Sequence, residues 1–594
     1  MSGHDVVVCF GFEADRVRRQ PWHVARGIAL GLLAHGRRVT IVTDARSPPG
    51  GEPFRIVALP RLFSGNAPDS ALRDALVMLA PDRIFVMIGI HELLRPGRLR
   101  LGARVFPIVA AQPFRPRDVL RLSAADLWRE RHLLRLTLLA AFLPDCLIRQ
   151  GFRQSGATGL VFVSAAARAR FAEMGIGVSL VLRPQVEPPP SVPTQVRSPV
   201  PTILYCGPPL ALRGADLALD AFERASAAGL EARLQLLLRP DDRPSLMRRF
   251  LARVERSPVR TSIEVVTEML PAEAMRRHLA AADVHLLPFR VTVSDTPLVV
   301  IEAGLTGRPV VVLDTPGVAE YARAFGGIVV DRPARLVAAL RDACGRAVQP
   351  IAVQEWTSWP QAVAPLDRWA GQTPPRLATI ALIGIDGAGK TTLLRRLQGR
   401  LAAAGQGSTH VWSRFRNYTS KPLLVLARLT GHNRKLVLGG VRIGVHEFAN
   451  GLAGPFLWLQ RLDLWLDRQL RIRPAAKRGL VVMDRCALDQ LVDMAVATGR
   501  EAELVERLAP NLLEGLPQPA LVVLVDREPL LIGTSRPDAL MDPKLLRRRA
   551  CYRLLAARLH LPVLQNDASL EAADRFLDRL VGLAPEPGGR RARG

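Results

Sequence analysis

Lysine is missing from the first 389 residues of this chain, although arginine is abundant throughout. The formal net charge is +27, which raises the possibility of a nucleic-acid partner. No basic run is interleaved with aromatic residues, however, and the chain has only 4 tyrosines. Because alanine, glycine, proline and leucine are abundant as well, compositional bias explains the arginine better, and we expect no nucleic-acid partner. A basic surface that lies on an anionic membrane remains the alternative.

Cysteine is scarce too, and long apolar runs are absent. The six cysteines are far apart and no pair has the spacing of metal ligands, so free thiols in a reducing cytosol are expected. No stretch reaches transmembrane length, and the first residues lack the basic start of a signal peptide. We therefore expect a cytoplasmic protein, with peripheral contact on the inner membrane face as the alternative.

A glycine-rich stretch contains the first lysine. Residues 384–392 read GIDGAGKTT, which fits G-x-x-x-x-G-K-[ST] between an apolar, β-branched run and a helical pattern. Glycines let successive backbone N–H groups converge on a phosphate, and the helix N-terminus adds partial positive charge. The motif predicts that ATP and Mg²⁺ bind here, with the Thr391 hydroxyl on the metal. The predicted phosphate-binding residues are Gly384, Asp386, Gly387, Ala388, Gly389, Lys390, Thr391 and Thr392.

The 594 residues are too many for one core, and three blocks of alternating strand and helix patterns appear. Proline-rich linkers at 184–201 and 371–376 separate them. We expect an α/β protein in which two doubly wound, Rossmann-like domains face each other and a third α/β domain follows. The predicted boundaries are 1–190 with 349–370 crossing back, 200–348, 377–584, and a disordered tail at 585–594.

The first 370 residues carry motifs of a known family. These are HVARGIALGLLAHGRRVTIVT, LYCGPPLALRGADLALDAF, AADVHLLPF and TPLVVIEAGLTGRPVVVLDTPGVAEY. They resemble the GT-B glycosyltransferases of group 1, similar to family four, which use activated sugar donors. The resemblance implies two facing Rossmann-like domains and a nucleotide sugar as donor substrate.

The same resemblance implies a donor site in the second domain. Glu302 matches a glutamate that holds the donor ribose, and Arg213 matches one of two basic residues that hold the diphosphate. The other basic residue of the family lies in a Gly-Arg pair, which is Gly207-Pro208 here. Gln112 stands where the family often has a histidine, and Ser294, beside Asp295, stands where it has an acidic residue. Because of these departures, the alternative is a degenerate transferase that has lost activity and serves as a scaffold. The expected donor-binding residues are Arg213, Ser294, Thr296, Pro297, Leu298 and Glu302.

The third block resembles thymidylate kinases and related nucleoside monophosphate kinases. The quoted loop carries their Asp-Gly pair, and GLVVMDRCALDQLVD, residues 479–493, resembles their strand that ends in Asp-Arg. The resemblance implies that Asp484 orders Mg²⁺ or its water shell and that Arg485 grips the acceptor phosphate. Because position 387 is glycine, the loop supplies no arginine, and Arg536 in the expected lid is the candidate transition-state cation. Lys390, Asp484, Arg485, Arg536 and Glu302 are the predicted catalytic residues, with Thr391 and Asp484 at the metal.

The acceptor side departs from that family. Ile383 replaces a glutamate, and HVWSRFRN at 410–417 replaces the usual Thr-Arg-Glu-Pro. Arg414, or alternatively Arg416, is therefore expected to join Asp386 and Arg485 at the acceptor. Residues 457–470 resemble the helix over the nucleobase, but an amphipathic core helix is the favoured interpretation. Residues 547–549, all arginine, are expected on a solvated helix face.

These observations predict a bifunctional enzyme. Its activities are glycosyl transfer from a nucleotide sugar and phosphoryl transfer from ATP to a nucleoside monophosphate such as dTMP. Polysaccharide or glycolipid synthesis is the expected setting, with a glycan or lipid-linked acceptor as a partner. The alternative is a kinase of a sugar or glycan that carries an inactive transferase as a binding scaffold.

Overall fold

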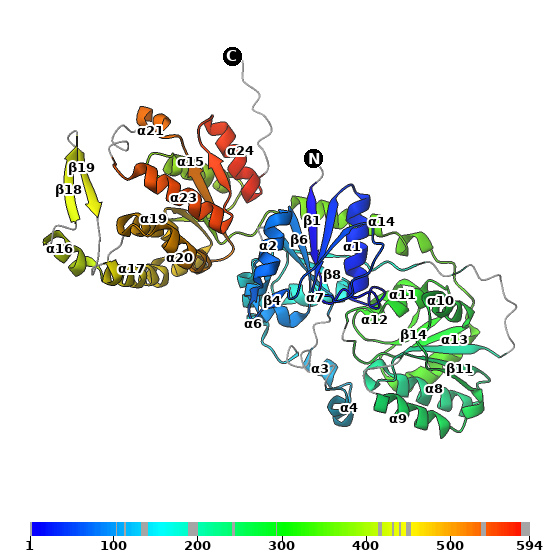
Figure 1. Cartoon of the computed structure of the whole chain (residues 1–594). Coiled ribbons are helices and arrows are strands. Elements are labelled where there is room, and N and C mark those ends of the chain that lie inside the picture. The colour runs from blue at the N-terminus through cyan, green and yellow to red at the C-terminus, as the bar shows by residue number, and fades with distance from the viewer. Residues whose placement is uncertain are drawn as a thin grey trace, which may run out of the picture. The chain divides into compact units, whose positions relative to one another are not determined.

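The computed structural model divides the chain into two compact units, Met1–Gln372 and Thr373–Gly594 (Figure 1). The described residues are all except 1–2, 102–103, 112–114, 132–140, 188–189, 191–199, 240–243, 293, 414–417, 430–432, 439–440, 447–452, 536–541 and 584–594. Arg414, Arg536 and the predicted tail at 585–594 lie outside the described residues. Within the described part, no helix has the length and apolarity needed to cross a membrane.

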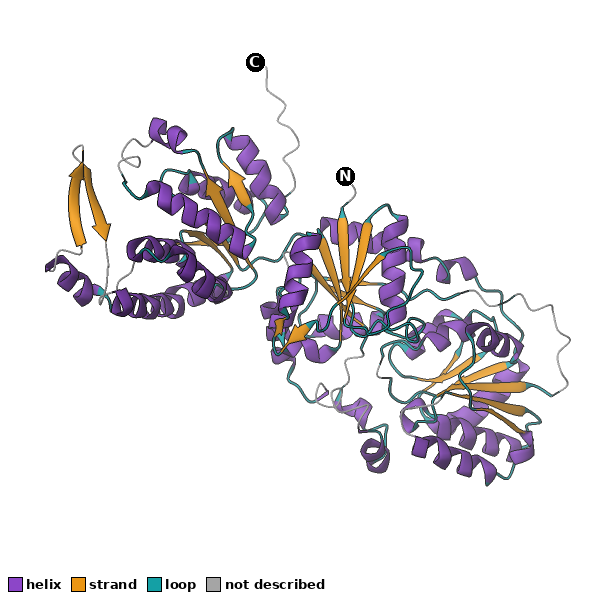
Figure 2. Cartoon of the chain, viewed as in Figure 1, coloured by secondary structure: helices purple, strands orange, loops and turns teal. Residues whose placement is uncertain are grey.

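A seven-stranded parallel sheet forms the first domain of Met1–Gln372, in the order β3-β2-β1-β6-β7-β8-β9. Its central strands are apolar and buried because helices cover both faces (Figure 2). The strands are β1 His4–Val8, β2 Arg38–Thr43, β3 Arg55–Ala58, β6 Arg83–Ile88, β7 Val105–Val109, β8 Leu160–Phe162 and β9 Ser179–Val181, with a small hairpin of β4 Phe63–Ser64 and β5 Ala67–Pro68. The helices are α1 Trp22–Ala34, α2 Ser70–Leu79, α3 Pro116–Val119, α4 Ala124–Arg129, α6 Asp145–Ser155 and α7 Ala165–Glu173.

The second domain has a six-stranded parallel sheet in the order β12-β11-β10-β13-β14-β15. The order reverses at β10, which is where such sheets bind ligands at their carboxyl ends. The strands are β10 Thr202–Gly207, β11 Arg233–Leu238, β12 Ile263–Val266, β13 Val284–Leu287, β14 Val310–Leu313 and β15 Ile328–Val330. The helices are α8 Ala215–Ala227, α9 Pro244–Glu255, α10 Ala272–Ala281, α11 Leu298–Gly304, α12 Val318–Ala324 and α13 Leu336–Gly345.

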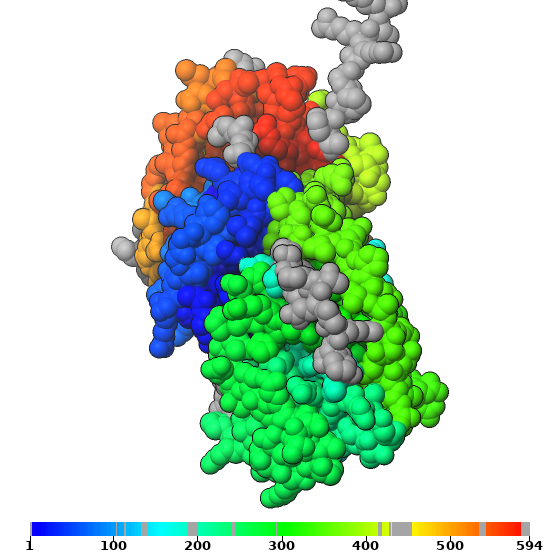
Figure 3. All heavy atoms as spheres, turned by 90° about the vertical axis from the view of Figure 1, so that its right-hand side faces the viewer, coloured from blue at the N-terminus to red at the C-terminus, as the bar shows by residue number. Residues whose placement is uncertain are grey.

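A helix after the second sheet returns to the first domain. This helix, α14 (Trp359–Gln372), packs against α1 (Figures 1 and 3). Gly27 and Gly31 of α1 permit the close approach, since a Cβ there would lie 2.1 Å and 2.5 Å from the side chains of Trp359 and Val363. Val363 is fully buried in the core of the first domain. Residues 359–372 therefore complete that domain.

The second unit is built on a five-stranded parallel sheet in the order β17-β20-β16-β21-β22. An antiparallel hairpin, β18 and β19, stands apart from it (Figure 1). The strands are β16 Thr379–Ile383, β17 Ser408–Val411, β18 Asn433–Leu438, β19 Val441–His446, β20 Leu480–Asp484, β21 Ala520–Asp526 and β22 Val563–Gln565. The helices are α15 Lys390–Ala403, α16 Lys421–Leu429, α17 Ala453–Asp467, α18 Arg473–Arg478, α19 Ala487–Thr498, α20 Glu501–Gly515, α21 Pro529–Ser535, α23 Leu545–Leu559 and α24 Leu570–Val581. The predicted fold class is confirmed.

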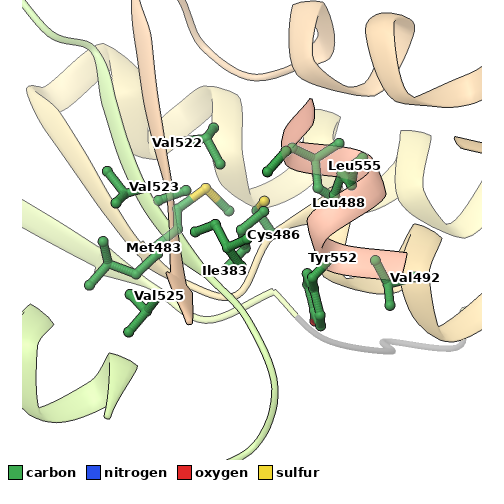
Figure 4. Packing of buried hydrophobic residues seen from close by; sticks show 14 of the residues in the cluster. Ile383, Met483, Cys486, Leu488, Val492, Val522, Val523, Val525, Tyr552 and Leu555 are labelled. Carbon is green, nitrogen blue, oxygen red and sulfur yellow. The ribbon is translucent and has the colours of Figure 1, made fainter. Parts of the chain in front are cut away.

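The core of this unit joins the sheet to the helices behind it. Figure 4 shows Met483 of β20 and Val523 of β21 on one side, and Leu488 of α19 and Leu555 of α23 on the other. All four side chains are fully buried. Burying a side chain of this size contributes roughly 1.5–3 kcal/mol, so the sheet is held rigidly where its strands end.

The packing of α14 predicts how the chain tolerates truncation. A chain that ends at Gln372 should unfold cooperatively, whereas a chain that ends at Val348 should be unstable, because it exposes the α1 surface that α14 covers. Residues 373–594 should fold alone. Circular dichroism during thermal unfolding of the three fragments measures this. Equal stability of the chain that ends at Gln372 and the chain that ends at Val348 would contradict the role of α14.

Candidate functional site

The phosphate loop connects β16 to α15, as the motif predicts. Gly387 and Gly389 have φ of 86° and 93°, in the left-handed region that favours glycine. At Gly384 a Cβ would lie 2.3 Å from the carbonyl oxygen of Val525 on β21. The chain can therefore follow this path only with glycines at these positions, and the loop lies at the N-terminus of α15.

Lys390 begins α15 and its side chain is buried. Its ammonium donates hydrogen bonds to the carbonyl oxygens of Gly384 and Ile385, both at 2.7 Å. The amine is therefore positioned inside the curve of the loop, where an arginine fork would have no room for its second nitrogen. This is the position from which a lysine reaches the outer phosphates of a nucleotide.

The predicted metal residues lie together. The Thr391 hydroxyl donates to a carboxylate oxygen of Asp484 at 2.5 Å. Asp484 is the last residue of β20 and is buried. A hydroxyl and a carboxylate oxygen at the loop are hard oxygen ligands of the kind that Mg²⁺ takes. Together with the glycines and Lys390, they fit a nucleoside triphosphate with its magnesium ion.

Arg485 and Asp386, both predicted at the acceptor, form an ion pair. Arg485 follows β20 directly and has φ of 82°, which is rare for a residue with a side chain. Backbone strain of this kind costs on the order of 1–3 kcal/mol and clusters at functional sites. The pair places one cation and one anion beside the phosphate loop.

Asp489 is a buried carboxylate behind these residues that motif reading missed. It accepts hydrogen bonds from the Tyr552 hydroxyl and the Cys486 amide, both at 2.8 Å. Burial raises its pKa, while the charges of Arg485 and Lys390 oppose that shift. The carboxylate thus holds the start of α19 in place and lies within electrostatic reach of both cations.

Asn566, in the turn after β22, supports the loop. Its amide nitrogen donates to the Ala388 carbonyl at 2.8 Å. A Cβ on Gly389 would lie 2.6 Å from that nitrogen, so the glycine also makes room for this contact. The turn after β22 therefore holds the loop from its outer side.

The expectation that all three arginines of 547–549 are solvated is wrong for Arg549. That side chain is buried and donates to Asp526 at 2.8 Å and to Glu528 at 2.8 Å. Burial raises the pKa of Asp526, but hydrogen bonds from Arg549 and Arg553 hold it below its usual value. The helix pattern could not reveal that α23 crosses the end of β21, where the Asp526 carboxylate requires a partner. Arg547 is exposed, as expected, and pairs with Glu501.

On the acceptor side, α17 confirms the amphipathic core interpretation. Phe456 and Leu464 join the core, while two carboxylates on the inner face bind the segment after β17. Asp463 accepts from the hydroxyls of Thr419 and Ser420, at 2.8 Å and 2.6 Å. The second carboxylate, Asp467, accepts from Ser413 and Tyr418. These bonds hold both ends of residues 414–417, which contain Arg414.

The candidate donor site lies at the carboxyl ends of β10 and β11. Burial, together with the positive charge of Arg239, lowers the pKa of Arg213 to about 10. Both arginines and Glu302 act electrostatically on the thiol of Cys206 in β10. Burial, reinforced by Glu187, raises the pKa of Glu302 to about 7. Arg213 and Arg239 therefore lie within electrostatic range of each other, and Glu302 lies within range of the same thiol.

Arg239 is a residue that sequence reasoning missed. Its amide donates to the carbonyl of Gly207, the residue before Pro208, where a basic side chain was expected. The strand order provides the missing signal: β11 runs parallel to β10, so the residue after β11 ends beside the residue after β10. Arg239, the residue after β11, therefore lies beside Pro208, where the basic side chain is missing.

The residues before α11 contact the first domain. Ser294 forms a β-bridge with Ala111, and the Asp295 amide donates to the carbonyl of Ala110 at 2.8 Å. The Asp295 carboxyl is fully buried and accepts from the Ser164 hydroxyl at 2.6 Å. Burial raises its pKa to about 7, and this hydrogen bond only partly offsets the shift. Thr296, Pro297 and Leu298 follow, and α11 begins at Leu298, as predicted.

Comparisons with known proteins agree with both halves of this description. Residues 200–347 match the family model of the glycosyl transferases group 1. The chain is 30% identical over 161 residues to the thymidylate kinase of Deinococcus radiodurans, a match that covers 26% of this chain and 66% of that enzyme.

Solved structures with a similar arrangement include WaaG, a glycosyltransferase involved in lipopolysaccharide biosynthesis, and the sucrose-phosphate synthase of Thermosynechococcus elongatus. Their sequence identities are 15% and 16%, and their TM-scores are 0.41 and 0.44. Each alignment covers 61% of this chain, with 95% of the first structure and 98% of the second. The match of residues 200–347 defines that part as a group 1 glycosyltransferase domain.

Proposed function

We propose that this protein is a bifunctional transferase. Residues 1–372 transfer a sugar from a nucleotide-sugar donor, and residues 373–594 transfer a phosphoryl group from ATP to an acceptor. The observation that carries the second activity is the phosphate loop, with Lys390 buried inside its curve and Thr391 bonded to Asp484. The gathering of Arg213, Arg239 and Glu302 carries the first.

In the transferase half, the two arginines are the groups that would hold the donor diphosphate. The charge of Arg239 lowers the pKa of Arg213, so bound anionic oxygens would relieve an existing repulsion. Glu302 is positioned to accept hydrogen bonds from donor hydroxyls, and backbone N–H groups around Thr296 to Leu298 could add further donors. A diphosphate that departs with its charge neutralised is a better leaving group.

The position of Arg239 predicts that its removal weakens binding of the nucleotide sugar. Arg239→Ala should raise the KM for the nucleotide sugar by about tenfold or more, because one charge-assisted contact contributes roughly 1.5–3 kcal/mol. Arg233→Ala is the matched control, because Arg233 is exposed at the opposite end of the same strand. Hydrolysis or transfer assays with a panel of nucleotide sugars measure both variants. Equal KM values in Arg239→Ala and Arg233→Ala would exclude Arg239 from the donor site.

In the kinase half, bound ATP with Mg²⁺ would supply the phosphoryl group and neutralise much of its charge. The chain's own part is to place Lys390 against the outer phosphates, to position Thr391 and Asp484 at the metal, and to orient the acceptor through Arg485. Arg536 remains the proposed additional cation. Phosphoryl transfer depends mainly on such positioning and on electrostatic stabilisation.

Lys390→Ala should lower ATP-dependent transfer by about a hundredfold or more while the unit stays folded, since one charge on the migrating group contributes several kcal/mol. Arg395→Ala, an exposed arginine one turn further along α15, should retain activity. Coupled measurement of ADP formation, with circular dichroism of each variant, tests this. Turnover in Lys390→Ala within about twofold of wild type would remove the catalytic assignment of the loop.

For the acceptor, we favour a nucleoside monophosphate such as dTMP. Arg485→Ala should then raise the KM for the acceptor by about ten- to a hundredfold and leave the KM for ATP nearly unchanged. Asp386→Ala should weaken acceptor use in the same selective way. Arg478→Ala, exposed before β20, serves as the control. Steady-state kinetics with each substrate varied separately measure the split; a larger effect on ATP would contradict the acceptor assignment.

A sugar or glycan acceptor, with the transferase half as a binding scaffold, is the second candidate. The observation that favours it is the insertion of α16 and the β18–β19 hairpin between β17 and α17, beside the altered segment at 410–417. If ADP forms with a glycan and with no nucleotide acceptor, this candidate replaces the first.

A further inference from the structure

One surface of the second unit is apolar and basic and has no part in the chemistry proposed above. It consists of the exposed faces of α16 and α17, which lie at one end of that unit together with the β18–β19 hairpin (Figure 1). Trp458 and Trp465 on α17 are 65% and 53% exposed, and Leu429 on α16 is 81% exposed. Val425 and Leu426 of α16 are exposed as well. Several large apolar side chains that face water over adjacent elements mark an interaction surface.

The two tryptophans lie on one side of α17, and the carboxylates on its other side are hydrogen-bonded within the protein. Positions 458, 461 and 465 follow the helical repeat, and all three are exposed. The opposite face carries Asp463 and Asp467, whose carboxylates are buried and bonded to residues 413–420. The outer face therefore presents tryptophan, arginine and tryptophan to solvent, and its helix contributes no exposed carboxylate.

The charge of this region is one-sided. Residues 387–446 contain no aspartate or glutamate. The two helices, residues 421–429 and 453–467, contain Lys421, Arg428 and Arg461, and their acidic residues are the buried Asp463 and Asp467. A surface with this charge attracts anions. Exposed tryptophans are in addition favoured at an interface between water and an apolar phase.

We propose that this surface docks on an anionic lipid bilayer. Tryptophan rings favour the headgroup region, where the apolar body and the indole N–H are both accommodated. Basic side chains add attraction to anionic headgroups, about 1 kcal/mol each, and the two effects together give reversible peripheral binding. A protein partner of acidic surface would satisfy the charge, but it does not call for two exposed tryptophans on one basic helix face.

The docked face adjoins the acceptor side of the phosphate loop. Asp463 and Asp467 on the inner face of α17 hold the segment that flanks Arg414, while Trp458 and Trp465 on the outer face contact the lipid. The bilayer would thus lie on the outer side of the helix whose inner side binds residues 413 and 418–420. This position favours an acceptor or product presented at a membrane surface.

The test uses the full chain in vesicle flotation, with phosphatidylcholine alone and with phosphatidylcholine that contains phosphatidylglycerol. We expect binding to the anionic vesicles, weakened by salt, and little binding to the neutral ones. Replacing both tryptophans, W458S with W465S, should lower the affinity by about tenfold or more, because a buried apolar side chain contributes more than the 1.4 kcal/mol of one decade. Trp128→Ser is the matched control, since Trp128 is 69% exposed on α4 in the other unit.

Three outcomes overturn the proposal. The wild-type chain floats with neither kind of vesicle; the double variant binds as tightly as wild type; or the double variant loses self-association in sedimentation without lipid, which would make the surface an interface between copies of the chain. Circular dichroism of the double variant shows whether it is folded. Quenching of tryptophan fluorescence by brominated lipid in the control, but not in the double variant, supports direct contact by these rings.

Discussion

The parallel pairing of β16 with β20 is the constraint on which the candidate kinase site depends. In its register Leu382 lies opposite Asp484, so the end of β20 arrives beside the start of the phosphate loop. Thr391 then bonds Asp484, and Arg485 turns towards Asp386. Because side chains alternate between faces along a strand, a slip of one residue would turn Asp484 away from the loop. The buried side chains of Ile380, Val482 and Met483 prevent that slip.

Local sequence predicted the parts of the structure that local physics determines. The phosphate loop was found because its glycines, lysine and threonine act within nine residues of each other. Asp484 and Arg485 were found because a buried strand delivers its last residues to the sheet edge. The two doubly wound sheets followed from alternating apolar strands and helical repeats.

The remaining features needed contacts between distant segments. Arg239 stands beside Gly207 only because β11 is the neighbour of β10, and strand order cannot be read from either segment alone. Arg549 was misplaced because its partner Asp526 is on a strand rather than on its own helix. Asp489 lies within the quoted stretch 479–493, but its role depends on Tyr552 from a different helix. Arg414 and Arg536 remain predictions from the sequence.

The two halves of the chain have a similar arrangement of charged side chains. Each gathers cations where parallel strands end, and each has a carboxyl group nearby, Asp489 in one half and Glu302 in the other. Anionic substrates offset the repulsion between such cations, which is why this arrangement suits diphosphate and triphosphate groups.

The central claim is that the second unit moves a phosphoryl group from ATP to an acceptor. The most direct measurement is transfer of radiolabelled γ-phosphate from ATP by the purified full chain to a panel of nucleoside monophosphates, sugars and glycans, with acceptor-free reactions as background. The account predicts a labelled product with one acceptor class, led by dTMP, and ADP formation in equal amount. ADP that forms without any labelled acceptor, or no ATP consumption at all, would contradict it.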